Sequence, residues 1–475
     1  MGEIWQGRHL EQDVQIAVKV VRHQAERSKD FEALFVSEVE AVASLHHPSI
    51  VCVHDYGKIT RAAAAASGER LIAGSPYLVM ELAGHGSLHD RPRPESWPEL
   101  RHILLQILDG LAHAHAHHLY HCDLKPGNVL VTATTRAGPT LKLTDFGLSH
   151  LTTSKPSKED DGGQHISAGT PGYMAPEQIH GRRREIGPWT DLYALGSMVY
   201  DLAVGRLPFV HSNPLRMMVA HLQDQPGPFE PRFDVPVELE EWVRRLLAKS
   251  PGARFLRAAD AAHTLWRMSE PNQTMASGEC SDVDRPDDGS QDTLVELGTL
   301  TTLLAWTPGT TLLSENVSAN EDAPPFESRP ASYPHAPPMA ERWEVKEAPP
   351  GRLLSGTGLG LFRLRRTGFV GREDDRDAIW SELARVGEEG RPRAMVLTGS
   401  MGSGKTALAQ WMARRADELG AAIVLYADHS LIGGPREGLG RMLSRFLRAE
   451  GLFDEELEAF EEGRLEAFLP DLDSR

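Results

Sequence analysis

The stretch YHCDLKPGNVL, residues 120–130, constrains this chain more than any other. It places a carboxylate at Asp123, a cation at Lys125 and an amide at Asn128 on what the sequence predicts to be one loop. Transfer of a phosphoryl group requires a carboxylate to accept the hydroxyl proton, a cation against the moving phosphate, and ligands for Mg²⁺. Asp145, in a DFG triplet further along, adds a second carboxylate for metal. These residues together indicate phosphoryl-transfer chemistry.

This ordered set resembles the protein-kinase signature. The resemblance implies an α+β, two-lobed protein-kinase fold over residues 1–270, with ATP and Mg²⁺ as cofactors. In such a site Asp123 orients the acceptor hydroxyl and accepts its proton, and Lys125 neutralises the γ-phosphate. Asn128 and Asp145 hold Mg²⁺. A lysine two residues after the aspartate is typical of kinases whose acceptors are serine and threonine, so the resemblance implies these acceptors.

A second lysine is expected at the nucleotide phosphates. Residues 15–21, QIAVKVV, are predicted to be a strand that carries Lys19. Apolar residues at helical spacing predict a helix over residues 31–45 that carries Glu38. The lysine needs a carboxylate partner, and the family pattern FxxExxAxxxLxHPxIV assigns that role to Glu38. Glu40 is the nearest rival, but it lies about 200° around the helix from Glu38.

Other nucleotide contacts follow from the resemblance. Residues 2–8, GEIWQGR, resemble the second half of a kinase glycine-rich loop. The first two glycines of that loop are absent, so we expect a sequence truncated at this end. Residues 77–83, YLVMELA, are predicted to be a buried strand leading into a connector. The resemblance implies ATP contacts at six positions beside Lys19: Gly2, Ile4, Ala17, Met80, Glu81 and Ala83.

Two further segments of this region have simpler interpretations. Residues 59–76 include a run of five alanines and are predicted to be an inserted loop without chemistry. Residues 97–118 are predicted to be a helix, on which His113 and His117 are spaced i, i+4, as zinc ligands can be. No acidic third ligand stands in register, and bacterial kinases carry similar histidine-rich runs without metal. Zinc is therefore the less favoured alternative.

One residue departs from the family pattern. Cys122 stands immediately before the catalytic aspartate, where kinases usually have an arginine that grips a phosphate on the activation segment. A thiol cannot make a bidentate charged contact, so we expect no switching by phosphorylation of this segment unless another basic side chain, such as Arg182 to Arg184, takes over the clamp. A redox-sensitive thiol is an alternative, although a small packed side chain is the commoner state of a lone cysteine.

The activation segment is expected over residues 145–177, which end in GTPGYMAPE. Thr170 matches the family threonine that contacts the catalytic aspartate and lysine. Asp191 resembles the aspartate that braces the catalytic loop from a buried helix. Arg254 resembles the arginine that pairs with Glu177. The resemblance gives these residues supporting roles.

Composition disfavours several other classes of protein. The chain has 475 residues and a formal net charge of -17, which disfavours nucleic-acid binding. Its three cysteines are widely spaced, which indicates neither a disulfide framework nor a zinc knuckle and fits a reducing, cytoplasmic setting. The N-terminus lacks the apolar core of a signal peptide. Residues 297–314 are uncharged but rich in threonine, so we expect no membrane span.

A change of composition after the kinase region indicates a second domain. Residues 271–366 are acidic and rich in proline, serine and threonine, which predicts a disordered linker. Residues 367–373, TGFVGRE, resemble a motif of bacterial STAND signalling ATPases. Strands are predicted over residues 394–398 and 421–428. Between them lies GSMGSGKT, residues 399–406, which fits the P-loop pattern.

The P-loop predicts a nucleotide site of its own. Backbone N–H groups between Gly399 and Gly404 are expected to cradle phosphate, Lys405 to reach the β and γ oxygens, and Thr406 to meet Mg²⁺. The chain ends without a strand that closes in paired acids. We therefore expect residues 367–475 to be a partial α/β P-loop NTPase domain that binds nucleotide without hydrolysing it.

The sequence thus predicts a bacterial, eukaryotic-like (Hanks-type) serine/threonine protein kinase joined to a STAND/AAA-type ATPase module, truncated at both ends. Its expected partners are protein substrates with serine or threonine hydroxyls, and self-association is compatible with the sequence. The alternative is a pseudokinase scaffold in which the P-loop module is the working part. The presence of Lys19, Asp123, Asn128 and Asp145 argues against that alternative.

Overall fold

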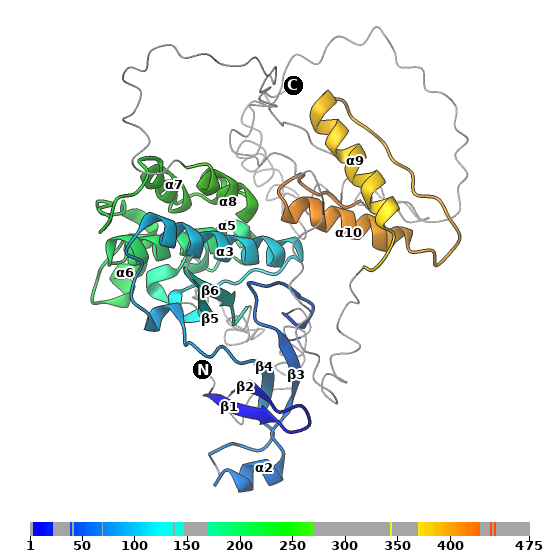
Figure 1. Cartoon of the computed structure of the whole chain (residues 1–475). Helices are drawn as coiled ribbons and strands as arrows, with labels where there is room; N and C mark the ends of the chain where they lie inside the picture. Colours follow the sequence, from blue (N-terminus) through cyan, green and yellow to red (C-terminus); the bar gives the residue numbers. More distant parts are fainter. Residues whose placement is uncertain are drawn as a thin grey trace, which may run out of the picture. The chain divides into compact units, whose positions relative to one another are not determined.

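A computed structural model describes residues 3–21, 39, 42–68, 70–135, 138–146, 170–268, 343, 369–427, 438 and 441–442. These residues fall into two compact units (Figure 1). One unit contains the described residues up to 268, and the other contains those from 343 onward. No helix within these ranges is both long and apolar enough to cross a membrane.

The first unit begins with a small antiparallel sheet (Figure 1). Its strand order is β1-β2-β4-β3. The register pairs Ile4 with Lys19, and Ala17 with Met80. Because neighbouring residues of a strand point to opposite faces, Ala17 and Lys19 share one face of the sheet. The strands are β1 (Glu3–His9), β2 (Val14–Val20), β3 (Val53–Lys58) and β4 (Pro76–Glu81).

The prediction that residues 59–76 form a loop was wrong in part, because a short helix, α2 (Arg61–Ala66), forms between β3 and β4. Thr60 caps it by accepting a hydrogen bond from a backbone N–H of the first turn, at 3.1 Å, and alanine has the highest helix propensity. Leu71 and alanines of this segment pack against Trp5 and its neighbours in a small apolar cluster. The segment thus covers the face of the sheet opposite Lys19.

A helical lobe follows the sheet. Helix α3 (Trp97–Ala116) lies at its centre, and the apolar stripe of this helix is fully buried. The prediction of a helix over residues 97–118 is therefore confirmed to within two residues. The remaining α-helices are α4 (Pro176–Ile179), α5 (Pro188–Val199), α6 (Pro214–Gln223), α7 (Glu238–Leu246) and α8 (Ala258–Trp266). A π-helical turn, η6 (Tyr200–Val204), continues α5. Short 3-10 helices are η1 (Leu88–Asp90), η4 (Pro171–Tyr173), η5 (Arg183–Glu185) and η7 (Pro251–Ala253).

A two-stranded ribbon positions the catalytic residues. Strands β5 (Val129–Thr135) and β6 (Gly138–Leu143) pair antiparallel, with Val129 opposite Leu143. The short helix η2 (Pro126–Asn128) leads into β5, and Asp145 follows β6. The catalytic loop and Asp145 therefore lie at the same end of the ribbon.

The second unit contains α9 (Glu373–Glu389) and α10 (Lys405–Glu418), which share an apolar cluster. The predicted strands over residues 394–398 and 421–428 are not formed among the described residues of this unit. A strand is defined by hydrogen bonds to a neighbouring strand, and residues 394–398 have no such partner in the described part. The apolar side chains Met395 and Leu397 pack on the cluster between the helices instead.

Candidate active site

Three polar side chains surround Asp123 in the catalytic loop. Lys125 Nζ lies 2.7 Å from Asp123 Oδ2 and donates a second hydrogen bond, also of 2.7 Å, to Thr170 Oγ1. The Thr170 hydroxyl donates to Asp123 Oδ1 at 3.1 Å. Asn128 Nδ2 donates to the backbone carbonyl of Asp123 at 2.8 Å and to its Oδ2 at 3.2 Å. The carboxylate of Asp123 is therefore fixed from three sides.

Asp145 and Lys19 meet across the two lobes. Lys19 Nζ lies 2.7 Å from Asp145 Oδ1, and both side chains are mostly buried. Asp145 has a φ of 66°, so its backbone occupies the left-handed region that L-residues rarely adopt. The predicted partner of Lys19, Glu38, lies outside the described residues, as does Gly2. Among the described residues, the structure thus brings Lys19 to the carboxylate of the DFG motif.

A buried aspartate on α5 holds the backbone of the catalytic loop. Asp191 accepts hydrogen bonds from the backbone N–H groups of His121 and Cys122, each at 2.8 Å. The ring of His115, on α3, approaches the same carboxylate at 2.8 Å. Burial alone would raise the pKa of Asp191, but the hydrogen bonds and charges of His115 and His121 hold that pKa below its ordinary value. Asp191 is thus an ionised anchor for the loop.

His115 is a member of the site that the sequence reasoning missed. That reasoning singled out its neighbours His113 and His117, whose rings lie 4.6 Å apart. No group of three or more His, Cys, Asp or Glu side chains within the described ranges could hold a metal ion. A signal for His115 was present, because it continues the helical spacing of the buried residues Leu108 and Leu111.

The backbone around Cys122 is also held by a residue of α4. Cys122 is buried and has a φ of 60°. The side-chain amide of Gln178 donates to its carbonyl at 2.7 Å. Gln178 is a second residue that the sequence reasoning missed, and only its position next to Glu177 in the APE motif pointed to it. The catalytic loop is therefore tied to both α4 and α5.

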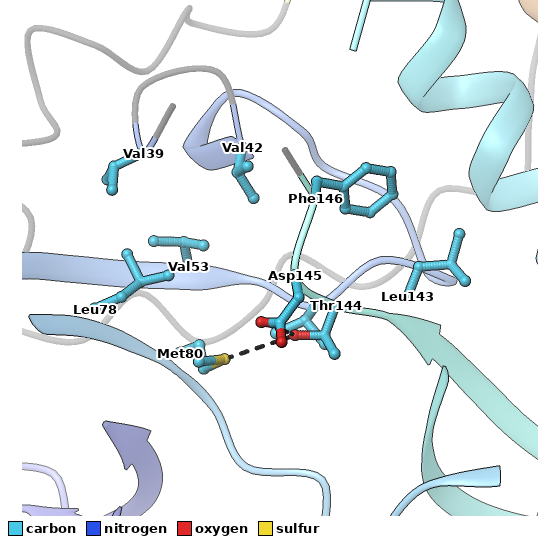
Figure 2. Close-up of a pocket in the computed structure, with 10 residues that line it drawn as sticks. Val39, Val42, Val53, Leu78, Met80, Leu143, Thr144, Asp145 and Phe146 are labelled. Atoms are coloured by element: carbon cyan, nitrogen blue, oxygen red, sulfur yellow. Dashed lines mark hydrogen bonds between the residues drawn. The ribbon is translucent and has the colours of Figure 1, made fainter. Parts of the chain in front are cut away.

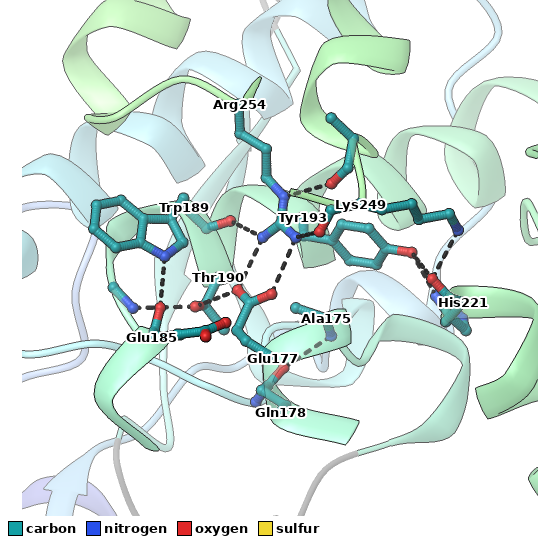
Figure 3. Close-up of polar contacts among 12 residues, drawn as sticks. Ala175, Glu177, Gln178, Glu185, Trp189, Thr190, Tyr193, His221, Lys249 and Arg254 are labelled. Atoms are coloured by element: carbon teal, nitrogen blue, oxygen red, sulfur yellow. Dashed lines mark hydrogen bonds and ion pairs between the residues drawn. The ribbon is translucent and has the colours of Figure 1, made fainter. Parts of the chain in front are cut away.

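A buried ion pair closes the activation segment (Figure 3). Arg254 donates to the two carboxylate oxygens of Glu177 at 2.9 and 3.0 Å, and both side chains are at most 1% exposed. Thr190 donates to the same carboxylate at 2.7 Å. The guanidinium also lies over the ring of Tyr193, at 4.7 Å. This arrangement fixes the C-terminal end of the segment against α5.

An apolar pocket lies beside Asp145 (Figure 2). Met80, from β4, and Thr144, before Asp145, meet there through a weak hydrogen bond of 3.9 Å from the hydroxyl to the sulfur. The other lining residues are Val39, Val42, Val51, Val53, Leu78, Leu143 and Phe146. The pocket therefore has an apolar interior with one carboxylate at its edge.

The predicted connector leaves the sheet after β4. The backbone N–H of Glu81 donates to the carbonyl of Cys52 at 3.0 Å. The Glu81 carboxylate accepts from the N–H of Cys52 at 2.7 Å and pairs with Lys142, also at 2.7 Å. Ala17 is buried beside Met80 in the inner cluster of the sheet, whereas Ile4 is 68% exposed.

The P-loop of the second unit starts α10. Lys405 Nζ donates to the carbonyls of Gly399 and Ser400, each at 2.9 Å. Gly399 and Gly404 have φ values of 153° and 82°, which only glycine adopts without strain. Thr406 is exposed in the first turn of the helix. Free N–H groups at a helix N-terminus next to a lysine make a site suited to phosphate.

A sheet lobe, a helical lobe and a fixed aspartate between them define a protein kinase. Comparison with known families agrees: the family described as "Protein kinase domain" matches residues 1–266, and "AAA ATPase domain" matches residues 368–474. The chain belongs to the protein kinase family and also contains an AAA ATPase domain. Both domains imply ATP binding.

Curated proteins similar to this chain include mycobacterial kinases. Serine/threonine-protein kinase PknA of Mycobacterium tuberculosis is 30% identical over 347 residues, which cover 71% of this chain and 71% of the relative. PknF of the same species is 30% identical over 58% of this chain and 56% of its own length. PknB of Mycobacterium leprae is 28% identical over 60% of this chain and 44% of its own length. The prediction of a protein kinase with an ATPase module is confirmed, and the pseudokinase alternative is not favoured.

Proposed function

We propose that this protein transfers the γ-phosphate of Mg-ATP to serine and threonine hydroxyls of protein substrates. The observation that carries the proposal is the network around Asp123. Its carboxylate is held by Lys125, Asn128 and Thr170 at hydrogen-bond distance. A carboxylate fixed in this way can orient an incoming hydroxyl and accept its proton during phosphoryl transfer.

Two lysines supply positive charge at different points of the nucleotide. Lys125 lies next to the catalytic carboxylate and would stabilise charge on the γ-phosphate. Lys19 lies next to Asp145 and would hold the phosphates nearer the nucleoside, with Glu38 as its proposed partner. Thr170 links Lys125 to Asp123, so it aligns the pair on the side from which a substrate hydroxyl arrives.

The metal ligands proposed are Asn128 and Asp145. Both nearby hydrogen bonds of Asn128 use its amide nitrogen, which leaves the amide oxygen as a ligand. Asp145 adds a carboxylate, and carboxylate and amide oxygens are donors that suit Mg²⁺. A bound Mg²⁺ would neutralise charge on the nucleotide phosphates.

The adenine is proposed to lie against Met80 and the connector. Because the N–H of Glu81 already donates to Cys52, an adenine contact at Glu81 falls to its carbonyl oxygen. Ala83, two residues on, would contribute its own backbone groups. Ala17, Ile4 and Gly2 are the proposed contacts from the first two strands.

The division of the chain is proposed as kinase at 1–270, linker at 271–366 and P-loop domain at 367–475. The two nucleotide-binding domains in one chain support a role in bacterial signal transduction. The three widely spaced cysteines support a cytoplasmic location. Gly399, Gly404, Lys405 and Thr406 are the proposed phosphate and metal contacts of the second domain.

The replacement Asp123→Asn tests the proposal. We expect transfer from ATP to a generic serine- and threonine-containing protein to fall at least about 100-fold, because the proton acceptor is lost. Asp234→Asn, at an exposed carboxylate of the same unit, is the matched control and keeps full activity. Phosphotyrosine as the only product, or unchanged activity in Asp123→Asn, would refute the proposal. ATP binding without any transfer by the unmodified protein would favour the scaffold.

A further inference from the structure

The second unit contains a buried arginine enclosed by aromatic rings. Arg376, on α9, is 6% exposed. Its guanidinium carbon lies 4.8 Å from the ring of Trp343, 4.9 Å from that of Phe369 and 4.7 Å from that of Trp411. One of its terminal nitrogens donates to the carbonyl of Phe369, and its Nε has no hydrogen-bond partner among the described residues.

A buried cation of this kind is costly unless its surroundings compensate for the lost water. No carboxylate pairs with Arg376 in the part of the chain that the structure describes. The carbonyl of Phe369 and the negative faces of the aromatic rings are what remains to stabilise the charge. Each ring that leaves would therefore weaken the compensation, so the three rings and the arginine depend on one another.

Of the three rings, Trp343 lies furthest along the sequence from the helices of this unit. It precedes the predicted start of the P-loop domain and belongs to the predicted linker. Its indole Nε1 donates to Asp377 Oδ1 at 2.7 Å, and its backbone carbonyl accepts from Arg415 Nε at 2.6 Å. Its ring meets that of Trp411 edge-on, with centroids 5.0 Å apart. Side chain and backbone of Trp343 are thus both bound, by α9 and by α10.

We propose that Arg376, Phe369 and Trp411 form a docking site for an aromatic side chain, and that its occupant is Trp343 of this chain's own linker. We name these three residues the arginine cage. The polar partners of Trp343, Asp377 and Arg415, recognise the indole N–H and the backbone carbonyl. The cage prefers tryptophan, because this side chain combines the most favourable ring for a cation with an N–H donor.

The cage is suited to open as well as to close. When the indole leaves, water can reach the guanidinium of Arg376, and hydration of the charge stabilises the open state. A leucine at position 376 would gain no such stabilisation. Docking at Trp343 fixes where the linker leaves the ATPase unit, and so sets the length of chain available between the two domains. The cage is also built on α10, the helix that begins at the P-loop lysine Lys405.

Limited proteolysis of the full chain with trypsin tests the docking. Within residues 271–342 the only lysine or arginine residues are Arg285, Arg329 and Arg342, and the first two precede proline, which blocks trypsin. Cleavage after Arg342 therefore reports on the bond next to Trp343. A docked residue must open before it is cut, so the cleavage rate follows the open population. Trp343→Ala should raise that rate by about tenfold to a hundredfold.

Matched variants separate docking from general effects. Trp306→Ala removes another tryptophan of the predicted linker and should leave cleavage after Arg342 unchanged. Trp343→Phe keeps the ring but loses the N–H donor, so its rate should lie between those of the unmodified protein and Trp343→Ala. Arg376→Met preserves apolar packing without the charge and should also accelerate cleavage.

The proposal is overturned by equal cleavage rates in Trp343→Ala and the unmodified protein, or by an equal acceleration in Trp306→Ala. Cuts inside α9 and α10 serve as the check on folding. If they stay as slow in Trp343→Ala as in the unmodified protein, then faster cleavage after Arg342 reports undocking and supports the proposal. If they accelerate in step with the cut after Arg342, Trp343 is a structural part of the domain core and the proposal fails.

Discussion

The buried pair of Glu177 and Arg254 allows a quantitative prediction for the replacement Arg254→Met. Besides Glu177, the guanidinium donates to the backbone carbonyls of Ala248, Trp189 and Lys249, at 2.7, 3.1 and 3.0 Å. Its removal leaves the Glu177 carboxylate buried with Thr190 as its hydrogen-bond donor. Breaking a buried pair from one side costs about 3 to 5 kcal/mol, because the remaining charge is uncompensated.

Hydrogen exchange measured by mass spectrometry is the suitable assay, because it reports each region of a two-unit chain separately. At about 1.4 kcal/mol per factor of ten, the expected loss corresponds to roughly two to nearly four orders of magnitude faster exchange in α5 when exchange is governed by opening. Amides of α9 and α10 belong to the other compact unit and should exchange at unchanged rates.

Arg244→Met is the matched control. Arg244 pairs with Glu240 at 2.6 Å, but the two side chains are 47% and 45% exposed and lie one helical turn apart. Such pairs contribute about 0.3 to 0.5 kcal/mol, so exchange should change by less than about threefold. Adding Glu177→Gln to Arg254→Met should recover part of the loss, because the uncompensated charge is removed. Similar exchange rates in α5 of Arg254→Met and Arg244→Met would show that burial does not set the cost of this pair.

Three further predictions concern pH, alignment and control. Burial lowers the pKa of His221 to about 3, so the unfolded chain binds a proton below pH 6.5 that the folded one does not. The free energy of unfolding of the first unit should therefore fall by about 2 kcal/mol between pH 6.5 and 5. Thermal unfolding of His221→Phe should lack this pH-dependent contribution. Thr170→Ala should lower kcat about tenfold or more, because it removes the hydroxyl that contacts both Lys125 and Asp123, whereas Thr170→Ser should keep most activity. Equal kcat values for Thr170→Ala and the unmodified protein would contradict this. Simultaneous replacement of the three serines of the activation segment by alanine should leave kcat within about twofold of that of the unmodified protein. A large loss of kcat, reproduced when the unmodified protein is treated with phosphatase, would show that phosphorylation of this segment controls the enzyme. These serines, outside the described residues, are Ser154, Ser157 and Ser167.

Much of the kinase unit could be predicted because its chemistry is local in sequence. Asp123, Lys125 and Asn128 stand within one loop, and loop spacing alone placed them together. The helix predicted over residues 97–118 is present, and its buried residues recur at helical spacing. The contact between Lys19 and Asp145 joins two distant segments, so only resemblance to a family could place both residues at one site.

The features that escaped prediction depend on burial or on distant contacts. Helix α2 was predicted as a loop, although Thr60 before the alanine run is a capping signal. His115 was passed over because histidines alone do not show which face of a helix is buried. Trp343 carries no local pattern, and its partners Arg376 and Trp411 lie on helices further along the chain. No reading of local periodicity brings such residues together.

The bonds that hold the catalytic loop support the prediction that it needs no arginine at position 122. Asp191 accepts the N–H of Cys122, and Gln178 donates to its carbonyl, so both bonds use the backbone. The φ of 60° at Cys122 costs about 1 to 2 kcal/mol for any residue other than glycine, and these bonds offset that cost whichever side chain is present. A phosphate gripped by arginine would tie the activation segment to this loop. Here Thr170 makes that tie directly, through the 2.7 Å bond from Lys125 and the 3.1 Å bond to Asp123. The loop is therefore aligned by contacts that need no phosphate.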